Sequence, residues 1–341
     1  MKAVILVGGE GTRLRPLSYI LPKAMMPVLG KPFLEHLISR LRAHRVDEIV
    51  LALSYKAQLL MDHFGDGSRL GVRLHYCLED PPLGTAGAVK NAAQYLDGPI
   101  FVLNGDIFTD LDFSAMLEFH RARKSEVTIA LTPVEDPSAF GVVETDAAGR
   151  VVGFVEKPPS GQVKTNMINA GVYIVEPEIV GLVPDRCFYM FEHSLFPRCI
   201  SDSRPFFAYP MNDYWIDMGT VERYRQLNCD LLRGRSRQVA GYPGMHLGKD
   251  CVLDPRARLE EPLFMAEGCV VESRAELRGP VVMGRSCRIG SGAVLEGTVL
   301  WSDVQVGEMA IVRDCTVAAG CRIGDGVEVE GKTIIQDYLG R

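Results

Sequence analysis

An apolar side chain recurs at every sixth position through the last part of the chain. The positions are Leu247, Leu253, Leu259, Met265, Val271, Leu277, Met283, Ile289, Leu295 and Trp301, then, after a break of ten residues, Ile311, Val317, Ile323 and Val329. A smaller apolar residue stands four positions after most of them, at Cys251, Ala257, Cys269, Ala275, Cys287, Ala293, Cys315 and Cys321. This pattern is typical of a β-solenoid with three short faces per turn, in which the large residue fills the interior and the small one fits a crowded corner.

The repeat resembles the left-handed parallel β-helix built from hexapeptides, which we expect over residues 247–341. A polar, basic stretch with glycine and proline precedes it, and this composition predicts a linker at 233–246. Five of the nine cysteines fall in the repeat, where we interpret them as small core residues rather than as metal or redox groups.

The first 232 residues predict a different fold. Strand-like segments at 3–7, 48–54 and 99–106 are apolar on both faces, and helical stripes follow them. This alternation predicts an α/β domain with a Rossmann-like, mostly parallel sheet covered by helices on both faces. Ligands of such sheets bind beyond the carboxyl ends of the strands. Gly8 and its neighbours and Asn104-Gly105-Asp106 are therefore expected to meet at one cleft.

Composition narrows the function classes. The net charge of −6 argues against a general nucleic-acid or anionic-membrane binder. No apolar run approaches the roughly 18 residues of a membrane span. The nine scattered cysteines and the lack of an export signal favour a reduced, cytoplasmic protein.

The stretch VGGEGTRLRPLSYILPKAMMPV at 7–28 joins flexible backbone to fixed positive charge. Glycines after a strand let backbone N–H groups approach an anion, and a guanidinium and an ammonium grip phosphate oxygens in different ways. These features predict a polyphosphate site. Its candidate ligands are Gly8, Gly9, Gly11, Thr12, Arg13 and Lys23.

Two other sequence motifs give only weak evidence for nucleotide binding. Gly9 and Gly11 begin the dinucleotide pattern G-x-G-x-x-G, but Leu14 stands at its third glycine, which disfavours a nicotinamide or flavin fold. GVEVEGKT at 326–333 satisfies the phosphate-loop pattern G-x-x-x-x-G-K-[ST]. That motif works only between a strand and a helix, whereas here it falls in the last turn of the expected solenoid.

In its sequence motifs the chain resembles the sugar-1-phosphate nucleotidyltransferases, also called nucleotide-sugar pyrophosphorylases. The resemblance rests on G-G-x-G-T-R-L-x-P-L with the P-K and M-x-P-V that follow, and on six further motifs in order. These are EDPPLGTAGAV (79–89), NGD (104–106), FGVVE (140–144), FVEKP (154–158), NAGVYI (169–174) and DYWIDMGT (213–220). The pattern is nearest to the mannose-1-phosphate guanylyltransferase group that carries hexapeptide repeats. Two departures, Ser18 for threonine and Ala24 for proline, remove no charged group.

The resemblance implies attack by a sugar 1-phosphate on the α-phosphorus of a nucleoside triphosphate, with pyrophosphate leaving. Catalysis is then positioning and charge neutralisation, with Arg13, Lys23 and Asp106 as catalytic residues. Arg13 holds the pyrophosphate, and Lys23 bridges the α-phosphate and the incoming phosphate. The implied sugar-phosphate ligands are Gly141, Glu156, Lys157 and Asn169. Asp106 and Asp217 are the expected ligands of Mg²⁺, which prefers hard oxygen donors.

Base choice follows from hydrogen-bonding chemistry. Guanine presents two adjacent donors that one carboxylate can accept together, whereas uracil and thymine flank a single donor with carbonyl groups. Glu79 stands where the family reads the base, and Gly84 would let the backbone touch the base or ribose. We therefore expect GTP, with mannose 1-phosphate as the matching acceptor.

Several alternatives remain open. Heptose or glucose 1-phosphate with GTP, UTP or dTTP would need the same chemistry. A non-catalytic sensor of nucleotide-sugars would be expected to lack Arg13, Lys23 or Asp106, and all three are present. An acyltransferase on the solenoid would need a histidine base, yet no histidine follows His246. The solenoid is instead expected to mediate assembly of a homo-oligomer or its regulation.

Overall fold

The computed structural model describes residues 1–159, 163–237 and 244–340, which form two compact units. The first comprises Met1–Glu10 and Leu34–Trp215, and the second comprises Gly11–Phe33 and Ile216–Arg341. The second unit therefore combines the N-terminal loop (Gly11–Phe33) with the C-terminal part of the chain. Part of the linker expected at 233–246, namely 238–243, lies outside the described residues.

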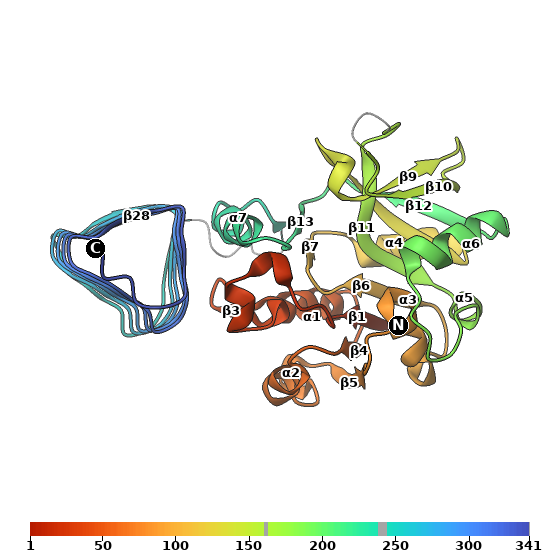
Figure 1. The fold of residues 1–341 in the computed structure, drawn as a ribbon, viewed down its shortest axis with the longest axis horizontal. Coiled ribbons are helices and arrows are strands. Elements are labelled where there is room, and N and C mark those ends of the chain that lie inside the picture. The colour runs from red at the N-terminus through yellow and green to blue at the C-terminus, as the bar shows by residue number, and fades with distance from the viewer. Residues whose placement is uncertain (160–162, 238–243, 341) are drawn as a thin grey trace. The chain divides into compact units, whose positions relative to one another are not determined.

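The first unit is built on one mixed sheet, whose main path runs β10-β9-β11-β6-β1-β4-β5 (Figure 1). Strands β6, β1, β4 and β5 are parallel, β11 runs antiparallel to β6, and β8 joins β11 to β12. The sheet strands are β1 (Lys2–Leu6), β4 (Glu48–Leu53), β5 (Arg73–Leu78), β6 (Ile100–Asn104), β8 (Val127–Pro133), β9 (Gly141–Thr145), β10 (Val151–Glu156), β11 (Met167–Val175) and β12 (Phe206–Pro210). The predicted α/β sheet is confirmed.

Helices cover both faces of this sheet because its central strands are apolar on both sides. Val4 and Val102, which are register partners, belong to the same buried cluster as residues of α3. On the other face Phe101 meets Phe113 of α4 edge to face, at 5.3 Å between ring centres. The helices are α1 (Phe33–Ala43), α2 (Ala57–Phe64), α3 (Gly84–Asn91), α4 (Phe113–Ala122), α5 (Pro177–Gly181) and α6 (Phe196–Ser201), with a π-helical turn at Phe191–Leu195. No described helix is long and apolar enough to cross a membrane.

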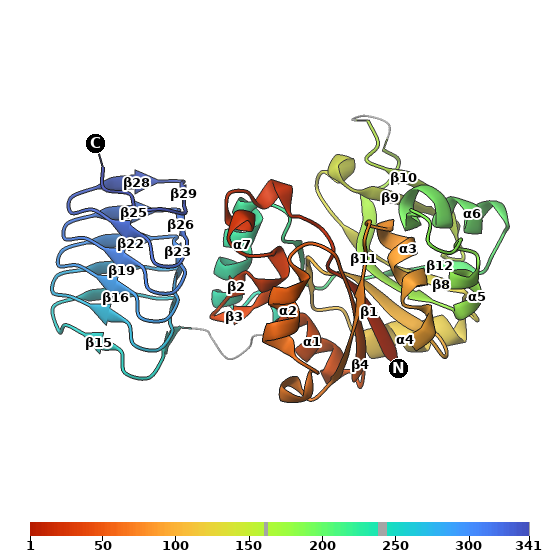
Figure 2. The ribbon, with the colours of Figure 1, turned by 60° about the horizontal axis from the view of Figure 1, so that its bottom comes forward.

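The second unit contains a parallel β-helix with three sheets, which appears as a three-sided outline in Figure 1 and as stacked turns in Figure 2. The first sheet consists of β14 (Met245–Leu247), β17 (Leu263–Met265), β20 (Val281–Met283), β23 (Val299–Leu300), β26 (Thr316–Val317) and β29 (Thr333–Ile334). The second consists of β15 (Val252–Leu253), β18 (Val270–Val271), β21 (Arg288–Ile289), β24 (Gln305–Val306) and β27 (Arg322–Ile323). The third consists of β16 (Arg258–Glu260), β19 (Glu276–Arg278), β22 (Val294–Glu296), β25 (Ile311–Arg313) and β28 (Glu328–Glu330).

The predicted period of six residues matches the strand pairing as far as Leu295. Two predicted interior positions beyond it, Trp301 and Ile311, are wrong. Met283 pairs with Leu300, not Trp301, and Leu295 pairs with Val312, not Ile311. A turn of the β-helix is one residue shorter from there on, which a fixed period of six does not detect. The apparent break of ten residues is therefore absent, because Val306 continues the interior row.

Most of the small apolar residues of the repeat are buried as expected, whereas Cys251 and Ala257 in its first turn are only half-buried. Cys269, Cys287 and Cys315 are fully buried, and all nine cysteines of the described chain are free thiols. The segment 326–333 lies in β28 and the turn before β29, so it does not form the strand-to-helix phosphate loop. Likewise β1 leads into 3₁₀ turns at Thr12–Leu14, Leu17–Tyr19 and Lys23–Met25, rather than into the helix of a dinucleotide fold. The remaining elements are β2 (Pro27–Val28), β3 (Lys31–Pro32), β7 (Ile107–Thr109), β13 (Trp215–Asp217) and α7 (Val221–Leu232).

Candidate active site

The predicted site residues are divided between the two units, and each group is described within its own unit. The first unit holds Gly8, Gly9, Glu79, Gly84, Asp106, Gly141, Glu156, Lys157 and Asn169. The second unit holds Gly11, Thr12, Arg13, Lys23 and Asp217.

The chain leaves β1 through Gly8, beside Ser54 and Glu79. The Ser54 hydroxyl donates a hydrogen bond of 2.6 Å to the carbonyl oxygen of Gly8. A Cβ atom on Gly8 would lie 3.2 Å from Oγ of Ser54 and 3.6 Å from Oε1 of Glu79. Gly9 is exposed. The structure thus brings the predicted base-reading carboxyl group next to the first glycine of the loop.

The Glu79 side chain is 9% exposed, and burial raises the pKa of its carboxyl group. Its Oε2 accepts a hydrogen bond of 2.9 Å from the backbone N–H of Leu83, which opposes this rise. Gly84 follows with φ of 75°, and a Cβ there would lie 2.8 Å from the carbonyl oxygen of Tyr189. Only glycine fits this left-handed turn at such close approach. Gly84 is also the first residue of α3, so this helix begins earlier than the apolar pattern of the sequence suggests.

A half-buried carboxyl group that the motifs do not single out lies behind this turn. Oε2 of Glu192 accepts a hydrogen bond of 2.8 Å from the hydroxyl of Thr85. The same hydroxyl oxygen accepts one of 2.9 Å from the backbone N–H of Phe191. Burial raises the pKa of Glu192, and the nearby carboxylate of Glu156 adds to this rise. The sequence signal was weak, because Glu192 stands in an otherwise aromatic run, FYMFEHSLFP.

Three predicted sugar-phosphate ligands meet at the end of β10. A Cβ on Gly141 would lie 2.6 Å from Cζ of Phe154 and 2.8 Å from Oε2 of Glu156, so the glycine lets both side chains come close to the strand. Nζ of Lys157 lies 3.4 Å from Oε1 of Glu156, and the lysine side chain is 66% exposed. Lys157 has φ of 47°, in the left-handed region that costs a non-glycine residue about 1–2 kcal/mol. The ammonium of Lys157 is thus accessible to solvent beside the carboxylate of Glu156.

Asn169, the fourth predicted sugar ligand, is fixed by two hydrogen bonds. Its amide Nδ2 donates to the hydroxyl of Tyr173 at 2.8 Å, and its Oδ1 accepts from the backbone N–H of Gly171 at 2.9 Å. The pKa of Tyr173 is raised well above its usual value, first by burial and then by the charges of Glu192, Glu156 and Asp106. The charges of three carboxylates in the first unit therefore act on one buried tyrosine.

Asp106 occupies the tight turn between β6 and β7. The N–H of the preceding Gly105 donates a hydrogen bond of 2.9 Å to the carbonyl oxygen of Leu6 in β1. A Cβ on Gly105 would lie 2.5 Å from Cγ1 of Val7 and 2.7 Å from that carbonyl oxygen. The close approach of this glycine joins the end of β6 to the end of β1. The expectation that these two strand ends lie together holds within the first unit.

In the second unit the N-terminal loop begins with Gly11 in the left-handed region, at φ of 64°. A Cβ there would lie 3.5 Å from Cβ of Ser18 and 3.8 Å from Cβ of Lys23. The loop therefore folds back so that Lys23 passes close to the glycine turn. Thr12 and Arg13 are exposed, while Ser18 and Ala24 are each 2% exposed.

Arg13 is brought beside Asp217, which the sequence places more than half the chain away. A Cβ on Gly219 would lie 2.8 Å from Oδ1 of Asp217 and 3.0 Å from Nη2 of Arg13. Oδ2 of Asp217 lies 3.6 Å from Nη1 of Arg223. The aspartate is 13% exposed in its side chain and sits among guanidinium groups. Arg223 is a further cation that sequence reasoning missed.

The donors available for a metal ion are carboxylate oxygens. No group of three or more His, Cys, Asp and Glu side chains within the described ranges could hold a metal ion. Magnesium typically takes one or two protein carboxylates and fills its remaining positions with phosphate oxygens and water. Asp106 in the first unit and Asp217 in the second each offer carboxylate oxygens of this kind.

The mixed α/β sheet, the glycine turns beside cations and carboxylates, and the β-helix define an enzyme that handles phosphorylated substrates. The chain belongs to the Nucleotidyl transferase family, which it matches over residues 2–234, and residues 259–339 match the GMPPB C-terminal domain. It is thus a sugar-1-phosphate nucleotidyltransferase, acting on a nucleoside triphosphate and a sugar phosphate.

Among similar proteins, mannose-1-phosphate guanylyltransferase of Mycobacterium tuberculosis is 41% identical over 262 residues, covering 75% of this chain and 70% of the relative. UTP–glucose-1-phosphate uridylyltransferase of Synechocystis is 34% identical, with 78% and 74% covered. The crystal structure of HddC from Yersinia pseudotuberculosis in complex with GMP-PN has a TM-score of 0.58 and 34% identity. It covers 67% of this chain and 97% of that one.

Proposed function

We propose that this protein transfers GMP from GTP to mannose 1-phosphate, yielding GDP-mannose and pyrophosphate. A phosphate oxygen of the sugar phosphate attacks the α-phosphorus of GTP. The bond from the α-phosphorus to the oxygen that bridges to the β-phosphate breaks, and its electron pair leaves with pyrophosphate. No enzyme nucleophile is needed, because the attacking phosphate is already ionised.

The observation that carries the choice of guanine is the buried carboxyl group of Glu79 beside Gly8. One of its oxygens accepts from Leu83, and Oε1 faces the glycine turn. A desolvated carboxylate discriminates strongly in favour of adjacent donors, since leaving its lone pairs opposite carbonyl groups is costly. The mannose-1-phosphate guanylyltransferases among the similar proteins support the same choice.

The roles proposed for the other residues follow their charges. Arg13 neutralises the departing pyrophosphate, and Lys23 bridges the α-phosphate and the incoming phosphate. Backbone N–H groups at Gly8, Gly9 and Gly11, with the Thr12 hydroxyl, bind triphosphate oxygens, and the backbone at Gly84 contacts the base or ribose. Lys157 binds the sugar phosphate, while Glu156, Asn169 and the backbone of Gly141 bind sugar hydroxyls. These assignments rest on family pattern and on the local geometry described above.

Asp106 and Asp217 are proposed to hold Mg²⁺. When bound, the ion neutralises charge on the triphosphate and so favours attack on the α-phosphorus.

Nine free cysteines, most of them buried, favour a reducing compartment such as the cytoplasm. We also propose that the β-helix contributes to a homo-oligomer. Light scattering of the chain ended near residue 235 tests this, and an oligomer of unchanged size would contradict it.

Two groups of alternatives remain, and only the first has specific support. UTP and glucose 1-phosphate are the substrates in the name of the Synechocystis relative, and a heptose phosphate would need the same residues. A non-catalytic sensor would bind nucleotide-sugar without turnover, yet Arg13, Lys23 and Asp106 are all present.

The decisive experiment is pyrophosphate release with GTP, UTP, dTTP and ATP, each combined with mannose, heptose and glucose 1-phosphates in the presence of Mg²⁺. We expect GTP with mannose 1-phosphate to give the highest kcat/KM. If another triphosphate and sugar phosphate gave the highest kcat/KM, the proposed substrates would be wrong, but the protein would still be a nucleotidyltransferase. Tight binding without turnover for every pair would favour the sensor.

A further inference from the structure

The β-helix and the N-terminal loop are joined within the second unit by one buried hydroxyl group. Tyr224 of α7 is fully buried, and its hydroxyl donates a hydrogen bond to the carbonyl oxygen of Pro27. The hydroxyl oxygen of Tyr224 in turn accepts a hydrogen bond of 2.9 Å from Nε1–H of Trp301. Burial raises the pKa of Tyr224, so the hydroxyl keeps the proton that it donates.

Trp301 is available for this contact because of the shortened turn of the β-helix. Its neighbour Leu300, and not Trp301, occupies the row that pairs with Met283. Adjacent residues of a strand point to opposite sides, so the indole leaves the interior of the β-helix. It is nevertheless only 2% exposed. A large aromatic residue outside the solenoid is thus covered and hydrogen-bonded.

Two further contacts fix the same segment of the loop. The backbone N–H of Leu29 donates to Oδ1 of Asn228 at 3.1 Å, and Nδ2 of Asn228 donates to the carbonyl oxygen of Tyr224 at 3.0 Å. Gly30 has φ of 77°, and a Cβ there would lie 3.2 Å from Cζ of Phe264 in β17. Residues on α7 and on the β-helix therefore contact one short hairpin.

This hairpin follows the predicted catalytic lysine almost directly. β2 and β3 pair Pro27 with Pro32, and the N–H of Phe33 donates to the carbonyl oxygen of Met26 at 3.0 Å. The N–H of Met26 in turn donates to the carbonyl oxygen of Lys23 at 3.2 Å. The hydrogen bond of Tyr224 to Pro27, the peptide bond from Pro27 to Met26 and the hydrogen bond of Met26 thus connect Tyr224 to the backbone of Lys23.

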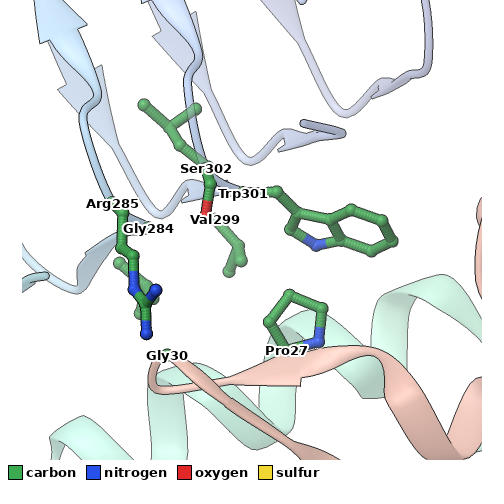
Figure 3. A pocket seen from close by; sticks show the side chains of 9 residues that line it. Pro27, Gly30, Gly284, Arg285, Val299, Trp301 and Ser302 are labelled. Atoms are coloured by element: carbon green, nitrogen blue, oxygen red, sulfur yellow. The ribbon is translucent and has the colours of Figure 1, made fainter. Parts of the chain in front are cut away.

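The contact between the N-terminal loop and the β-helix is not fully packed, because a cavity remains beside Pro27 and Trp301. A pocket of about 150 Å³ is lined by Pro27 and Gly30 of the loop and, among others, by Trp301 and Arg285 of the β-helix (Figure 3). Figure 3 shows the Trp301 ring and the Pro27 ring on one side of this space. In a partly open contact of this kind, the hydrogen bonds of Tyr224 help to set the distance between the loop and the β-helix, together with the approach of Gly30 to Phe264.

We propose that Tyr224 and Trp301 are positioning residues, through which the β-helix holds the N-terminal loop so that Lys23 stays in place for phosphate transfer. The inference rests on the role proposed for Lys23. It assigns the β-helix a part in catalysis within each chain, independent of its part in assembly.

The test uses Tyr224→Phe and Trp301→Phe in the full chain. Each removes hydrogen bonds and retains an aromatic ring. The matched control is Thr298→Val, because the Thr298 hydroxyl is buried just before β23 and donates to the carbonyl oxygen of Glu296 at 2.8 Å, without contact to the loop. The same hydroxyl lies 3.3 Å from the carbonyl oxygen of Val312 and accepts from the N–H of Cys315 at 3.4 Å, so the control removes buried hydrogen bonds in the same turn of the β-helix.

Hydrogen exchange measured on peptides that span 12–33 is the first readout. We expect exchange at least 10-fold faster in Tyr224→Phe and Trp301→Phe than in the unaltered chain, and unchanged rates in Thr298→Val. Unchanged exchange in Tyr224→Phe, or an equal rise in the control, would overturn the proposal.

Steady-state kinetics with the best substrate pair found for the unaltered chain is the second readout. We expect kcat about 10-fold lower in both loop-contact variants, with both KM values changed less than 2-fold, since the variants disturb transfer more than binding. A kcat within 2-fold of the unaltered value, or an equal loss in Thr298→Val, would contradict it. A best pair other than GTP and mannose 1-phosphate refutes only the substrate choice. If no pair turns over, the proposed function fails and hydrogen exchange alone decides whether Tyr224 and Trp301 hold the loop.

Discussion

The hydroxyl of Thr85 donates a 2.8 Å hydrogen bond to the carboxyl group of Glu192, 107 residues further along the chain. The carbonyl oxygen of Tyr189, in the same later segment, accepts hydrogen bonds from the N–H groups of Ala86 and Gly87. The turn that starts α3 is therefore held from behind by the segment around the π-helical turn. Since Glu79 bonds to Leu83 in that turn, the proposed base-reading residue depends on this support.

Replacing Thr85 by valine should destabilise the fold. The change leaves the half-buried Glu192 carboxyl group and the Phe191 N–H without this partner. An unsatisfied buried polar group costs about 1–3 kcal/mol, more when it is charged. Urea denaturation should show a loss of at least that size for Thr85→Val and a much smaller loss for Thr85→Ser. Equal stabilities of the two variants would show that the hydroxyl is not used.

The stability of the protein should also report the titration of Glu192. Burial raises the pKa of this carboxyl group in the folded state above its unfolded value. The folded state then binds the proton more tightly, so this contribution is fully present below the ordinary pKa of glutamate and is lost as pH rises through the folded pKa. The unfolding free energy of the unaltered chain should therefore fall relative to that of Glu192→Gln over this window. Parallel curves for the two proteins would refute the assignment.

Base selection should follow the charge of Glu79. Guanine's two donors require an acceptor pair, and an amide presents one donor instead, so Glu79→Gln should lower kcat/KM for GTP roughly 10- to 100-fold. ATP use should gain relative to GTP. Burial raises the pKa of Glu79, so KM for GTP should climb as pH falls toward that raised value, and the variant should lack this rise. An unchanged preference for GTP in Glu79→Gln would exclude the carboxylate as the base reader.

Sequence patterns predicted the two architectures because each depends on local periodicity. The hexapeptide count placed Met265, Met283 and Leu295 in the interior rows, and it slipped only where a turn lost one residue. Trp301 is itself apolar, so counting alone gave no sign of the slip. Pairing of β1 with β4 and β6 follows from strands that are apolar on both faces.

Contacts between distant segments were harder to predict. Glycines mark tight turns wherever they stand, and Gly84, Gly141 and Gly219 indeed lie where a Cβ would collide with a neighbour. Glu192 and Tyr224 gave no comparable signal, because their roles come from partners far along the chain. A linear division at residue 232 likewise gave no sign that the N-terminal loop belongs to the same compact unit as the β-helix.

Lys157 should contribute to sugar-phosphate binding and little to triphosphate binding. Its ammonium is exposed beside Glu156, and a charge-assisted hydrogen bond to phosphate contributes about 1.5–3 kcal/mol. Lys157→Met should raise KM for the sugar phosphate about 10- to 100-fold and change KM for the triphosphate less than 2-fold. Lys164→Met is the matched control, because Lys164 forms an exposed ion pair of 3.1 Å with Glu144. Equal effects of the two substitutions would contradict a specific role for Lys157.

Gly219 should control the spacing of Arg13 and Asp217. A methyl group there would lie 2.8 Å from Oδ1 of the aspartate and 3.0 Å from Nη2 of the arginine, so Gly219→Ala must push both groups away. A displacement of about 1 Å at a catalytic group can cost about 100-fold in rate, and we expect a loss of that order in kcat. Gly181→Ala in α5 is the control, because a Cβ at that position meets nothing within 4 Å. Should Gly219→Ala retain the kcat of the control, Arg13 and Asp217 would not form the phosphate and metal site proposed for them.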